Sequence, residues 1–257
     1  MLQILNNTTA PPDTADPADS PTLAARVAAL NHRFRHHSAH DVLTHALHGM
    51  ERIALVSSFG AESVVLLHMA AVISPATPVL FIDTEMLFTE TLVYQREVAE
   101  RLGLSNLRIL RGADIASHDP DGTLHLRDPD ACCALRKTAP LEAALKGFEG
   151  WITGRKRFQS STRARLDFFE VEKGAARIKV NPLAWWSTQD LRDYMEENRL
   201  PRHPLVARGY ASIGCAPCTS PVSAGEDPRA GRWRGRDKEE CGIHFVNGRA
   251  EREESPK

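Results

Sequence analysis

The sequence predicts an α/β fold built on an open, mostly parallel sheet with helices on both faces. Short apolar runs at residues 53–58, 78–84 and 106–110 are predicted strands, and the stretches between them at 62–73 and 87–103 have the spacing of helices. Strands and helices that alternate in this order are typical of parallel strands joined by crossover helices. A length of 257 residues, 42% of them hydrophobic, is enough for a substantial buried core.

The N-terminal part of the chain predicts a leader followed by two helices. Residues 1–22 are expected to be disordered, because most of this segment is Pro, Asp, Thr and Ala and offers little that a core would bury. Apolar residues then recur every three or four positions from Leu23 to Phe34, and a second amphipathic stretch continues to about Gly49. We expect these two helices to lead into the first strand.

The rest of the domain continues the alternation. The helix at 62–73 is apolar on nearly every side, which indicates burial against the sheet. Ser187 and Asp190 have the spacing of a capping box and predict the start of a later helix. The remaining predicted elements are helices at 134–145 and 187–200 and strands at 150–154 and 177–180.

The composition changes after about Ser220, where glycine and charged residues become dense and aliphatic residues become rare. Such a segment cannot form a core of its own. We therefore expect residues 23–222 to form the α/β domain and residues 223–257 to form a mobile, flexible C-terminal tail.

The net charge and the absence of long apolar runs exclude several classes of protein. A formal net charge of −1 gives no global field that would favour nucleic acid or an anionic membrane as a partner. The sequence shows no signal-peptide pattern and no run of about 18 apolar residues. We therefore expect a cytoplasmic protein without nucleic-acid or membrane partners. A homo-oligomer is compatible with this composition. In that reducing compartment, five cysteines indicate metal binding or catalysis before disulfides.

The segment SSFGAES at 57–63 lies where a predicted strand ends and a helix begins. Its backbone amides, hydroxyl groups and glycine allow it to close around an anion at the positive end of the helix. An ordinary turn is the alternative, since the segment is neither a Walker A nor a GxGxxG motif. In an open sheet the ligand crevice lies at the carboxyl ends of the strands, where the next strand places an aspartate. The candidate nucleotide-binding residues are Ser57, Ser58, Phe59, Gly60, Glu62 and Asp83.

A basic segment, GRKRFQSSTR at 154–163, follows another predicted strand. Forked guanidinium groups match phosphate or sulfate oxygens, and the hydroxyl and amide groups between them complete a site for an anion. A solvated basic loop or a nucleic-acid patch is the alternative. The position after a strand favours a small anionic ligand, with Gly154, Arg155, Gln159 and Arg163 as candidates.

Four cysteines form a candidate metal site: the adjacent Cys132 and Cys133, and the CxxC pair Cys215 and Cys218. An adjacent pair directs its sulfurs toward two irons of a cubane more easily than toward one tetrahedral zinc, so an iron–sulfur cluster is favoured and structural zinc is the alternative. Lys137 follows on a predicted helix, where its charge can offset that of the thiolates.

The fifth cysteine, Cys241, is a candidate nucleophile in the tail. Five basic residues precede it between Arg229 and Lys238, and His244 follows it. Cationic neighbours favour the reactive thiolate form of a cysteine, whereas two adjacent glutamates oppose it.

Taken together, these motifs resemble the adenylyl-sulfate and phosphoadenylyl-sulfate reductase family of assimilatory sulfate reduction. The resemblance is carried by SSFGAE, LFIDT, CCALRK, GRKRFQSSTR, GCAPCT, GRW and ECGIH, which run in the family's order from Ser57 to His244. It implies an adenine nucleotide alpha-hydrolase-like fold. Members that carry CC and CxxC bind a [4Fe-4S] cluster and generally use adenylyl sulfate, so the resemblance implies this cofactor and this substrate. The segment between GRW and ECGIH is shorter here than in the family pattern, which affects how the tail docks.

The resemblance also implies a covalent reaction in cysteine biosynthesis. Cys241 attacks the sulfur of adenylyl sulfate, AMP leaves, and thioredoxin (or glutaredoxin) reduces the thiosulfonate and releases sulfite. His244 orients the substrate or tunes Cys241, and the loop after the first strand surrounds the nucleotide. The phosphosulfate is held by Lys137, Arg155, Arg163, Arg229 and Arg232.

Other functions remain open at this point. A phosphoadenylyl-sulfate reductase, or an enzyme that accepts both sulfates, is the nearest alternative. A tRNA-thiolating ATP pyrophosphatase shares the nucleotide fold but usually has SGGxDS in the first loop, where this chain has SSFGAES. A zinc-stabilised nucleic-acid module would use residues 154–163 and the tail, and the nearly neutral net charge counts against it.

Overall fold

Six strands form one sheet in this computed structural model, which describes residues 21–172, 174–236 and 238. The strands are β1 (Ile53–Ser57), β2 (Val79–Ile82), β3 (Leu107–Leu110), β4 (Gly150–Ile152), β5 (Phe169–Val171) and β6 (Ile178–Val180). Their order in the sheet is β3-β2-β1-β4-β6-β5, and every pair is parallel except β5 with β6. The predicted open, mostly parallel sheet is confirmed, whereas the antiparallel strand β5 was not predicted.

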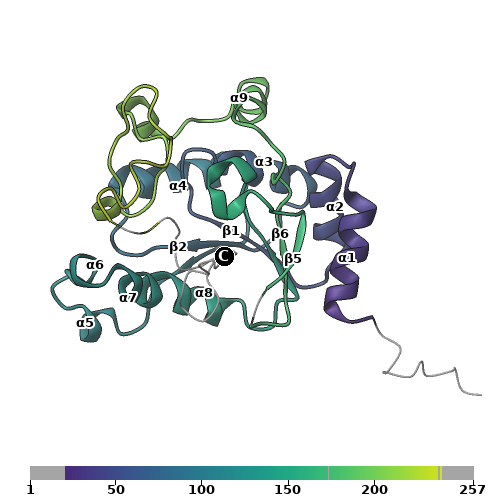
Figure 1. Ribbon diagram of the computed structural model, residues 1–257, viewed down its shortest axis with the longest axis horizontal. Coiled ribbons are helices and arrows are strands. Elements are labelled where there is room, and N and C mark those ends of the chain that lie inside the picture. Colours follow the sequence, from purple (N-terminus) through teal and green to yellow (C-terminus); the bar gives the residue numbers. More distant parts are fainter. Residues whose placement is uncertain (1–20, 173, 237, 239–257) are drawn as a thin grey trace, which may run out of the picture.

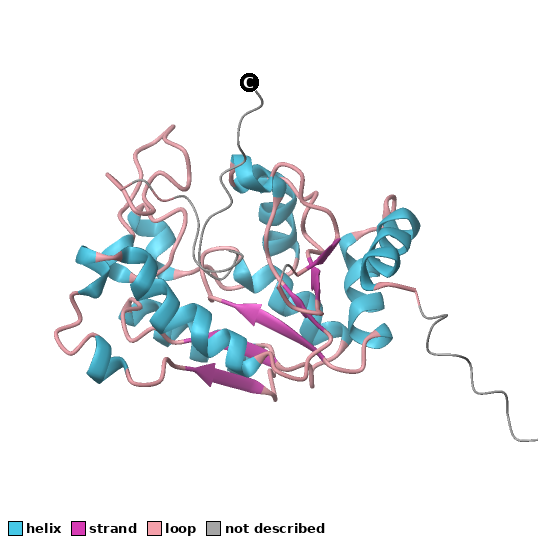
Figure 2. Ribbon diagram, turned by 60° about the horizontal axis from the view of Figure 1, so that its bottom comes forward, coloured by secondary structure: helices cyan, strands magenta, loops and turns pink. Residues whose placement is uncertain are grey.

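Helices cover both faces of the sheet (Figure 1, Figure 2). The helices that follow β1 and β2 lie on one face, and the helix that precedes β4 lies on the other. The predicted burial of the helix after β1 is confirmed, because most of its residues are buried. These helices are α3 (Ser63–Ile73), α4 (Thr89–Arg101) and α8 (Ala139–Ala144).

The strands contribute to two cores, because successive side chains of a strand point to opposite faces of the sheet. Leu55 of β1 and Phe81 of β2 belong to the larger core, together with α3 and α4. Their neighbours Ala54 and Leu80 belong to a smaller core on the other face, where Leu141 of α8 packs on them. The sheet is therefore buried on both sides, as a parallel sheet requires.

The two N-terminal helices and a late helix extend the larger core, where Phe34, Leu43 and Leu191 are buried. The predicted capping box is confirmed: Ser187 and Asp190 exchange hydrogen bonds between side chain and backbone at the start of the late helix. These helices are α1 (Leu23–Phe34), α2 (Ala39–Gly49) and α9 (Thr188–Glu197).

The prediction of a regular helix at 134–145 is wrong in two respects: the helix starts earlier, and it is not α-helical throughout. The helical path begins earlier, at Pro129, and passes through a π-helix before α8. Asp128 caps its start by accepting hydrogen bonds from two backbone N–H groups (3.0 and 2.9 Å), so Cys132 and Cys133 lie on a helix. The short helices are α5 (Ile115–His118), α6 (Leu124–Arg127), α7 (Pro129–Cys133), η2 (Ala134–Thr138), η3 (Arg157–Gln159), η4 (Ser161–Arg163), η5 (Pro204–Arg208) and η6 (Ala216–Cys218).

Part of the predicted tail packs against the CxxC segment. Thr219 pairs with Arg232 in an isolated antiparallel bridge. Trp233 donates its backbone N–H to the carbonyl of Cys218 (3.1 Å), and its side chain is only 3% exposed. The residues around Arg232 are thereby fixed next to η6.

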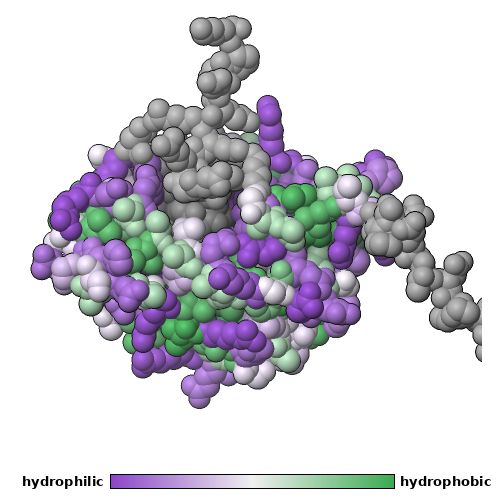
Figure 3. Space-filling view, turned by 90° about the horizontal axis from the view of Figure 1, so that it is seen from below, coloured by the Kyte–Doolittle hydropathy of each residue, from purple (hydrophilic) through white to green (hydrophobic). Residues whose placement is uncertain are grey.

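Residues 1–20 and 239–257, with Cys241 and His244, lie outside the described residues, so the disorder of the leader and the mobility of the tail beyond Lys238 stay predictions. Within the described part, no helix is long and apolar enough to cross a lipid bilayer. On the face shown in Figure 3, hydrophobic residues appear in several separate places rather than in one continuous patch. Scattered exposure of this kind is usual for protein surfaces.

Candidate functional site

A cavity of about 240 Å³ lies at the carboxyl ends of β1 and β4. The strand order reverses here, because the chain runs from β1 through β2 to β3 and then returns to place β4 on the other side of β1. Ligands of open α/β sheets bind at such a switch point. Ser57 and Ser58 line the cavity from the end of β1, and Thr153 and Gly154 line it from the end of β4.

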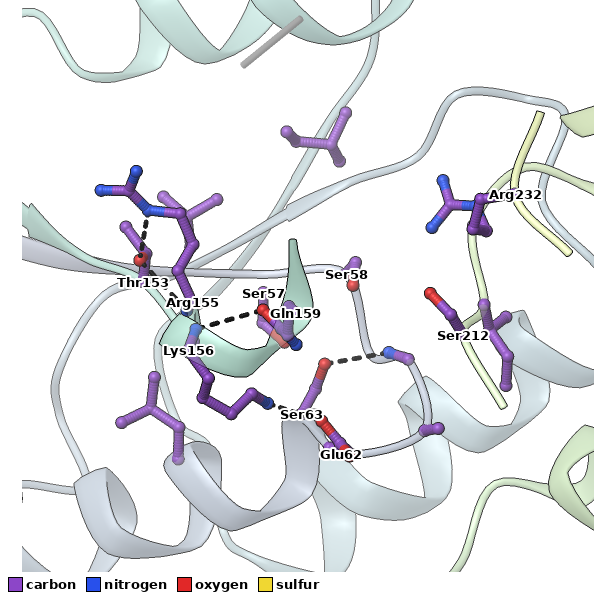
Figure 4. Close-up of a pocket in the computed structure, with 18 of the residues that line it drawn as sticks. Ser57, Ser58, Glu62, Ser63, Thr153, Arg155, Lys156, Gln159, Ser212 and Arg232 are labelled. Atoms are coloured by element: carbon purple, nitrogen blue, oxygen red, sulfur yellow. Dashed lines mark hydrogen bonds and ion pairs between the residues drawn. The ribbon is translucent and has the colours of Figure 1, made fainter. Parts of the chain in front are cut away.

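Most of the candidate substrate-binding residues gather around this cavity, although they come from separate segments of the chain. Figure 4 shows Arg155 and Lys156 on one side, Ser212 and Arg232 on the opposite side, and the loop after β1 between them. The candidates that line the cavity are Ser57, Ser58, Gly60, Glu62, Lys137, Gly154, Arg155, Gln159, Arg163, Arg229 and Arg232.

The structure does not bring Phe59 and Asp83 to the cavity wall. Phe59 has a positive φ of 48°, and its fully buried ring packs edge-to-face on Phe81 with 5.2 Å between ring centroids. The carboxylate of Asp83 accepts hydrogen bonds from Nε and Nη2 of Arg111 (3.0 and 2.9 Å) and from the backbone of Glu85 (3.0 Å). Both residues therefore support the loops beside the cavity, Phe59 from the core and Asp83 from the end of β2.

The lining of the cavity is strongly cationic. Among the lining residues that the structure describes, Glu62 is the one carboxylate. Cations gathered in a partly desolvated cleft create a local positive potential, although the whole chain has a net charge of −1. An anionic ligand suits this lining, whose basic residues are Lys137, Arg155, Lys156, Arg163, Arg229 and Arg232.

Lys156 is a lining residue that sequence reasoning did not select. Its side chain is buried, and its ammonium group forms an ion pair with Glu62 (2.6 Å). Burial lowers the pKa of Lys156, Glu62 opposes this effect, and the nearby Arg163 and Arg229 lower the pKa further. The basic segment at 154–163 contained the signal for this residue, whereas nothing in the sequence pointed to Ser212.

Hydroxyl groups within the loop after β1 hold its backbone in place. Oγ of Ser57 accepts a hydrogen bond from the N–H of Phe59 (3.2 Å), and Oγ of Ser63 accepts one from the N–H of Gly60 (3.0 Å). Gly60 also lies close to another backbone, since a Cβ here would be 3.3 Å from the carbonyl oxygen of Ile213. The positive end of α3 is therefore directed at the cavity by a fixed loop, which favours an anion.

The four candidate metal-binding cysteines lie on two segments that meet beside the cavity. Oγ1 of Thr84, a lining residue, is 3.2 Å from Sγ of Cys215. Arg136, just after α7, donates a hydrogen bond to the carbonyl of Thr84 (2.9 Å), which connects the two segments. No disulfide joins the four thiols, of which Cys132, Cys133 and Cys215 are buried and Cys218 is partly exposed.

The surroundings of these thiols suit a bound anionic group. Burial raises the pKa of Cys132 and of Cys218, the neighbouring thiols raise both further, and Lys137 lowers both. In the described part of the chain, three residues that interact with Cys132 or Cys218 each have a buried N–H group without a hydrogen-bond partner. Unpaired buried donors are rare in proteins and indicate a missing acceptor. They are Nε of Arg136, Nε of Arg232 and Nε1 of Trp233.

The donor set fits an iron–sulfur cluster. Four cysteines arranged as CC and CxxC supply only thiolates, which such clusters prefer. Among the described residues, no three His, Cys, Asp or Glu side chains converge closely enough to hold a single metal ion. A cubane is larger than a single ion, so its four thiolates are spaced more widely, each bound to a different iron.

Known proteins match this chain in sequence. Residues 52–221 match the family model for the phosphoadenosine phosphosulfate reductase domain. An adenosine 5'-phosphosulfate reductase of Mesorhizobium japonicum is 48% identical over 227 residues, which cover 87% of this chain and 89% of the relative. A phosphoadenosine 5'-phosphosulfate reductase of Gloeobacter violaceus is 39% identical over 199 residues, which cover 76% of this chain and 83% of the relative.

The fold also matches a solved structure. The phosphoadenylyl-sulfate (PAPS) reductase of Candida auris, a phosphate complex, superimposes with a TM-score of 0.68 and 28% sequence identity. The match covers 79% of this chain and 98% of that chain, so the predicted fold class is confirmed over most of its length.

Proposed function

The chain belongs to the phosphoadenosine phosphosulfate reductase family, and we propose that it reduces adenylyl sulfate to sulfite and AMP in assimilatory sulfate reduction. The observation that carries this proposal is the cavity at the switch point of the sheet, where six basic side chains face one carboxylate. Adenylyl sulfate is a small nucleotide whose negative charge is concentrated in a phosphosulfate group. A lining of fixed cations favours such a ligand. The name of the Mesorhizobium japonicum relative supports the choice of substrate.

The basic residues act where charge develops during the reaction. When the bond between sulfur and the bridging oxygen breaks, negative charge moves to the phosphate of AMP. Cations held in position before the reaction lower the barrier for this step, because they need no reorganisation. Lys137, Arg155 and Arg232 reach the cavity from three different segments and are suited to this role.

We propose Cys241 as the nucleophile, on the strength of the sequence resemblance. Its thiolate attacks the sulfur of adenylyl sulfate, the sulfur–oxygen bond breaks, and AMP leaves with the bonding electrons. A thiol of thioredoxin then attacks Sγ of Cys241, sulfite leaves, and the second thioredoxin thiol frees Cys241 as a disulfide forms in thioredoxin. The two thiols supply both electrons. His244 is proposed to orient the substrate or to tune Cys241.

We also propose that Cys132, Cys133, Cys215 and Cys218 bind a [4Fe-4S] cluster, a proposal that the donor set and the three unpaired N–H groups support. When bound, the cluster supplies fixed charge and a rigid link beside the substrate. Lys137 connects the two sites, because it lines the cavity and lowers the pKa of Cys132 and of Cys218.

The activity is tested with anaerobically purified protein, thioredoxin and each of the two sulfonucleotides, with sulfite and AMP measured as products. We expect kcat/KM to be higher for adenylyl sulfate than for its 3′-phosphorylated form. The Cys241→Ser variant is expected to bind AMP as the wild type does and to release no sulfite. Turnover by that variant would show that another group is the nucleophile.

A phosphoadenylyl-sulfate reductase, or an enzyme that accepts both substrates, is the second candidate. The names of the Gloeobacter violaceus relative and of the Candida auris structure support it. The ratio of the two kcat/KM values decides between the candidates. Sulfite formation from neither substrate would contradict both.

The cluster is tested by metal analysis of the same preparation. Brown protein with iron and acid-labile sulfide in near-equal amounts is expected, and colourless protein that contains zinc would contradict the proposal. Replacement of Cys215 by Ser should lower the iron content. Replacement of Lys137 by Ala should keep the iron and weaken turnover, because this change leaves all four thiols in place.

A further inference from the structure

Asn181 follows β6 directly and lies at the centre of a buried polar network beside the cavity. The residue is fully buried, and its backbone is held on both sides: its N–H donates to the carbonyl of Phe168 (2.7 Å), and its carbonyl accepts from the N–H of Ala184 (3.0 Å). The network joins the loop after β4, which lines the cavity, to the edge strand β5. Asn181 was not among the candidate site residues predicted from the sequence.

The side-chain amide of Asn181 uses its full hydrogen-bonding capacity. Oδ1 accepts hydrogen bonds from the hydroxyl of Thr153 (2.7 Å) and from Nη2 of Arg155 (3.1 Å). Nδ2 donates to the carboxylate of Glu170 (2.8 Å) and to the carbonyl of Asp167 (2.9 Å). A reversed amide would place its oxygen against the Glu170 carboxylate and the Asp167 carbonyl, which can only accept hydrogen bonds, so these partners fix its orientation.

The same network fixes one edge of the Arg155 guanidinium. Nε donates to the hydroxyl of Thr153 (3.3 Å), and Nη2 donates to Asn181 and to Glu170. Glu170 in turn is held by the amide of Asn181. The guanidinium is therefore oriented by groups that also contact one another, and Asn181 touches Thr153, Arg155 and Glu170.

We propose that Asn181, together with Glu170, positions Arg155 for the anionic group of the substrate. The inference rests on the proposed function, because it assigns Arg155 to the ligand. Asn181 does not line the cavity, so it acts through Arg155 and is a positioning residue. A charged group held in place before binding contributes more to catalysis than one that must reorganise, since the entropic cost is met in folding.

The chain offers a matched control in Asn31 of α1. This asparagine also holds β5, because Nδ2 donates to the carbonyl of Phe169 (2.8 Å) and Oδ1 accepts from the N–H of the same residue (2.9 Å). Its side chain forms hydrogen bonds with Phe169 and not with Arg155. Asn31→Asp therefore adds the same charge and disturbs the same strand as Asn181→Asp, without a direct effect on the guanidinium.

The test compares kcat/KM for adenylyl sulfate in a double-mutant cycle of Asn181→Asp and Arg155→Ala. We expect Asn181→Asp to lower kcat/KM about 10- to 100-fold, in line with the effect of a small misplacement of a catalytic group. In the Arg155→Ala background, Asn181→Asp is expected to have little further effect, because its target is gone. Asn31→Asp should leave kcat/KM near the wild-type value.

A compensating change adds a second check. In the Asn181→Asp, Glu170→Gln double variant, the carboxylate and the amide exchange places, so the total charge and most donor–acceptor pairs are restored. We expect this variant to regain most of the lost kcat/KM. Equal losses in the Asn31 and Asn181 variants, or additive losses with Arg155→Ala, would overturn the inference.

The affinity for ADP, measured by calorimetry, repeats the comparison without turnover. ADP presents adjacent phosphate groups to the same cations, so Asn181→Asp should weaken its binding about tenfold while Asn31→Asp does not. Unchanged ADP affinity in Asn181→Asp would overturn the positioning role. Failure of the wild type to release sulfite would instead overturn the proposed function, because ADP binding does not depend on it.

Discussion

Gly214 makes room for Arg232, one of the cations of the cavity. A Cβ at this glycine would overlap the guanidinium group of Arg232, which lies directly against the backbone. The guanidinium is also held over the ring of Trp233, 4.5 Å from its centroid. We predict that Gly214→Ala displaces Arg232 and raises KM for the sulfonucleotide about tenfold, with a smaller effect on thermal stability.

Combination with Arg232→Ala tests the cause of this effect. If Gly214 is needed only for the space that Arg232 occupies, Gly214→Ala should raise KM no further once that side chain is removed. Additive effects on KM would contradict this explanation and would indicate a separate role for the backbone at Gly214.

The sequence predicted many of the cavity residues because the ends of parallel strands meet at one edge of a sheet. Ser57 ends β1, and Gly154 and Arg155 come shortly after β4, so all three could be assigned on this basis. Phe59 could not be placed, since its direction depends on a positive φ that turns its ring into the core. Asn181 also follows a strand, but its role depends on Glu170 of the unpredicted β5.

At the scale of elements, His203 ties η5 to α4. The N–H of Leu205 donates to Nδ1 of His203 (3.2 Å), so the proton resides on Nε2, which lies 3.0 Å from Oγ1 of Thr91. Burial lowers the pKa of His203 from 6.5 to about 4, slightly opposed by Glu90. A second proton on the ring would abolish the hydrogen bond from Leu205.

This pKa shift predicts a loss of stability in mild acid. The folded protein binds the proton less readily than the unfolded chain, so the contribution of His203 is complete above pH 6.5 and declines as the pH falls toward 4. The full decline corresponds to about 3 kcal/mol. Urea unfolding of the wild type between neutral and mildly acid pH measures it.

The His203→Gln variant is the control for this prediction. It should be less stable at neutral pH but lose less stability on acidification than the wild type. Some dependence on pH should remain, because burial also lowers the pKa of His45 and of His68. The same slope in both proteins would contradict the assignment to His203.

Two elements could not be predicted because they depend on partners far away in the sequence. β5 has only three residues and pairs antiparallel with β6, and side-chain contacts of Asn31 with Phe169 hold it against α1. The π-helix after Cys133 changes the register of an otherwise regular helix, next to the buried ion pair of Arg136 with Asp119 (2.8 Å). Local apolar periodicity predicts neither the π-helix nor β5. The longer strands and helices, which it does predict, are confirmed.

For the molecule as a whole, the net charge of the chain differs in sign from the charge of the cavity lining. The chain has a net charge of −1, yet the cavity collects six basic side chains. We predict that the affinity for AMP falls as the salt concentration rises, because salt screens the attraction between these cations and the phosphate. Calorimetric titrations at low and high salt measure this dependence.

Two arginine variants locate the source of the salt effect. Arg163→Gln removes a lining cation and should reduce the dependence of AMP affinity on salt. Arg202→Gln removes an exposed arginine that pairs with Glu196 at the end of α9 and should leave the dependence unchanged. Equal slopes in all three proteins would show that the cavity is not the source.

The position of β1 in the sheet has a consequence for synthesis of the protein on the ribosome. β1 pairs with β2, which is made soon after it, and with β4, which appears only in the second half of the chain. Until Gly150 has emerged, one side of this apolar strand has no partner, and open strand edges recruit other chains. We therefore expect the nascent N-terminal half to be more prone to aggregation than the full-length chain.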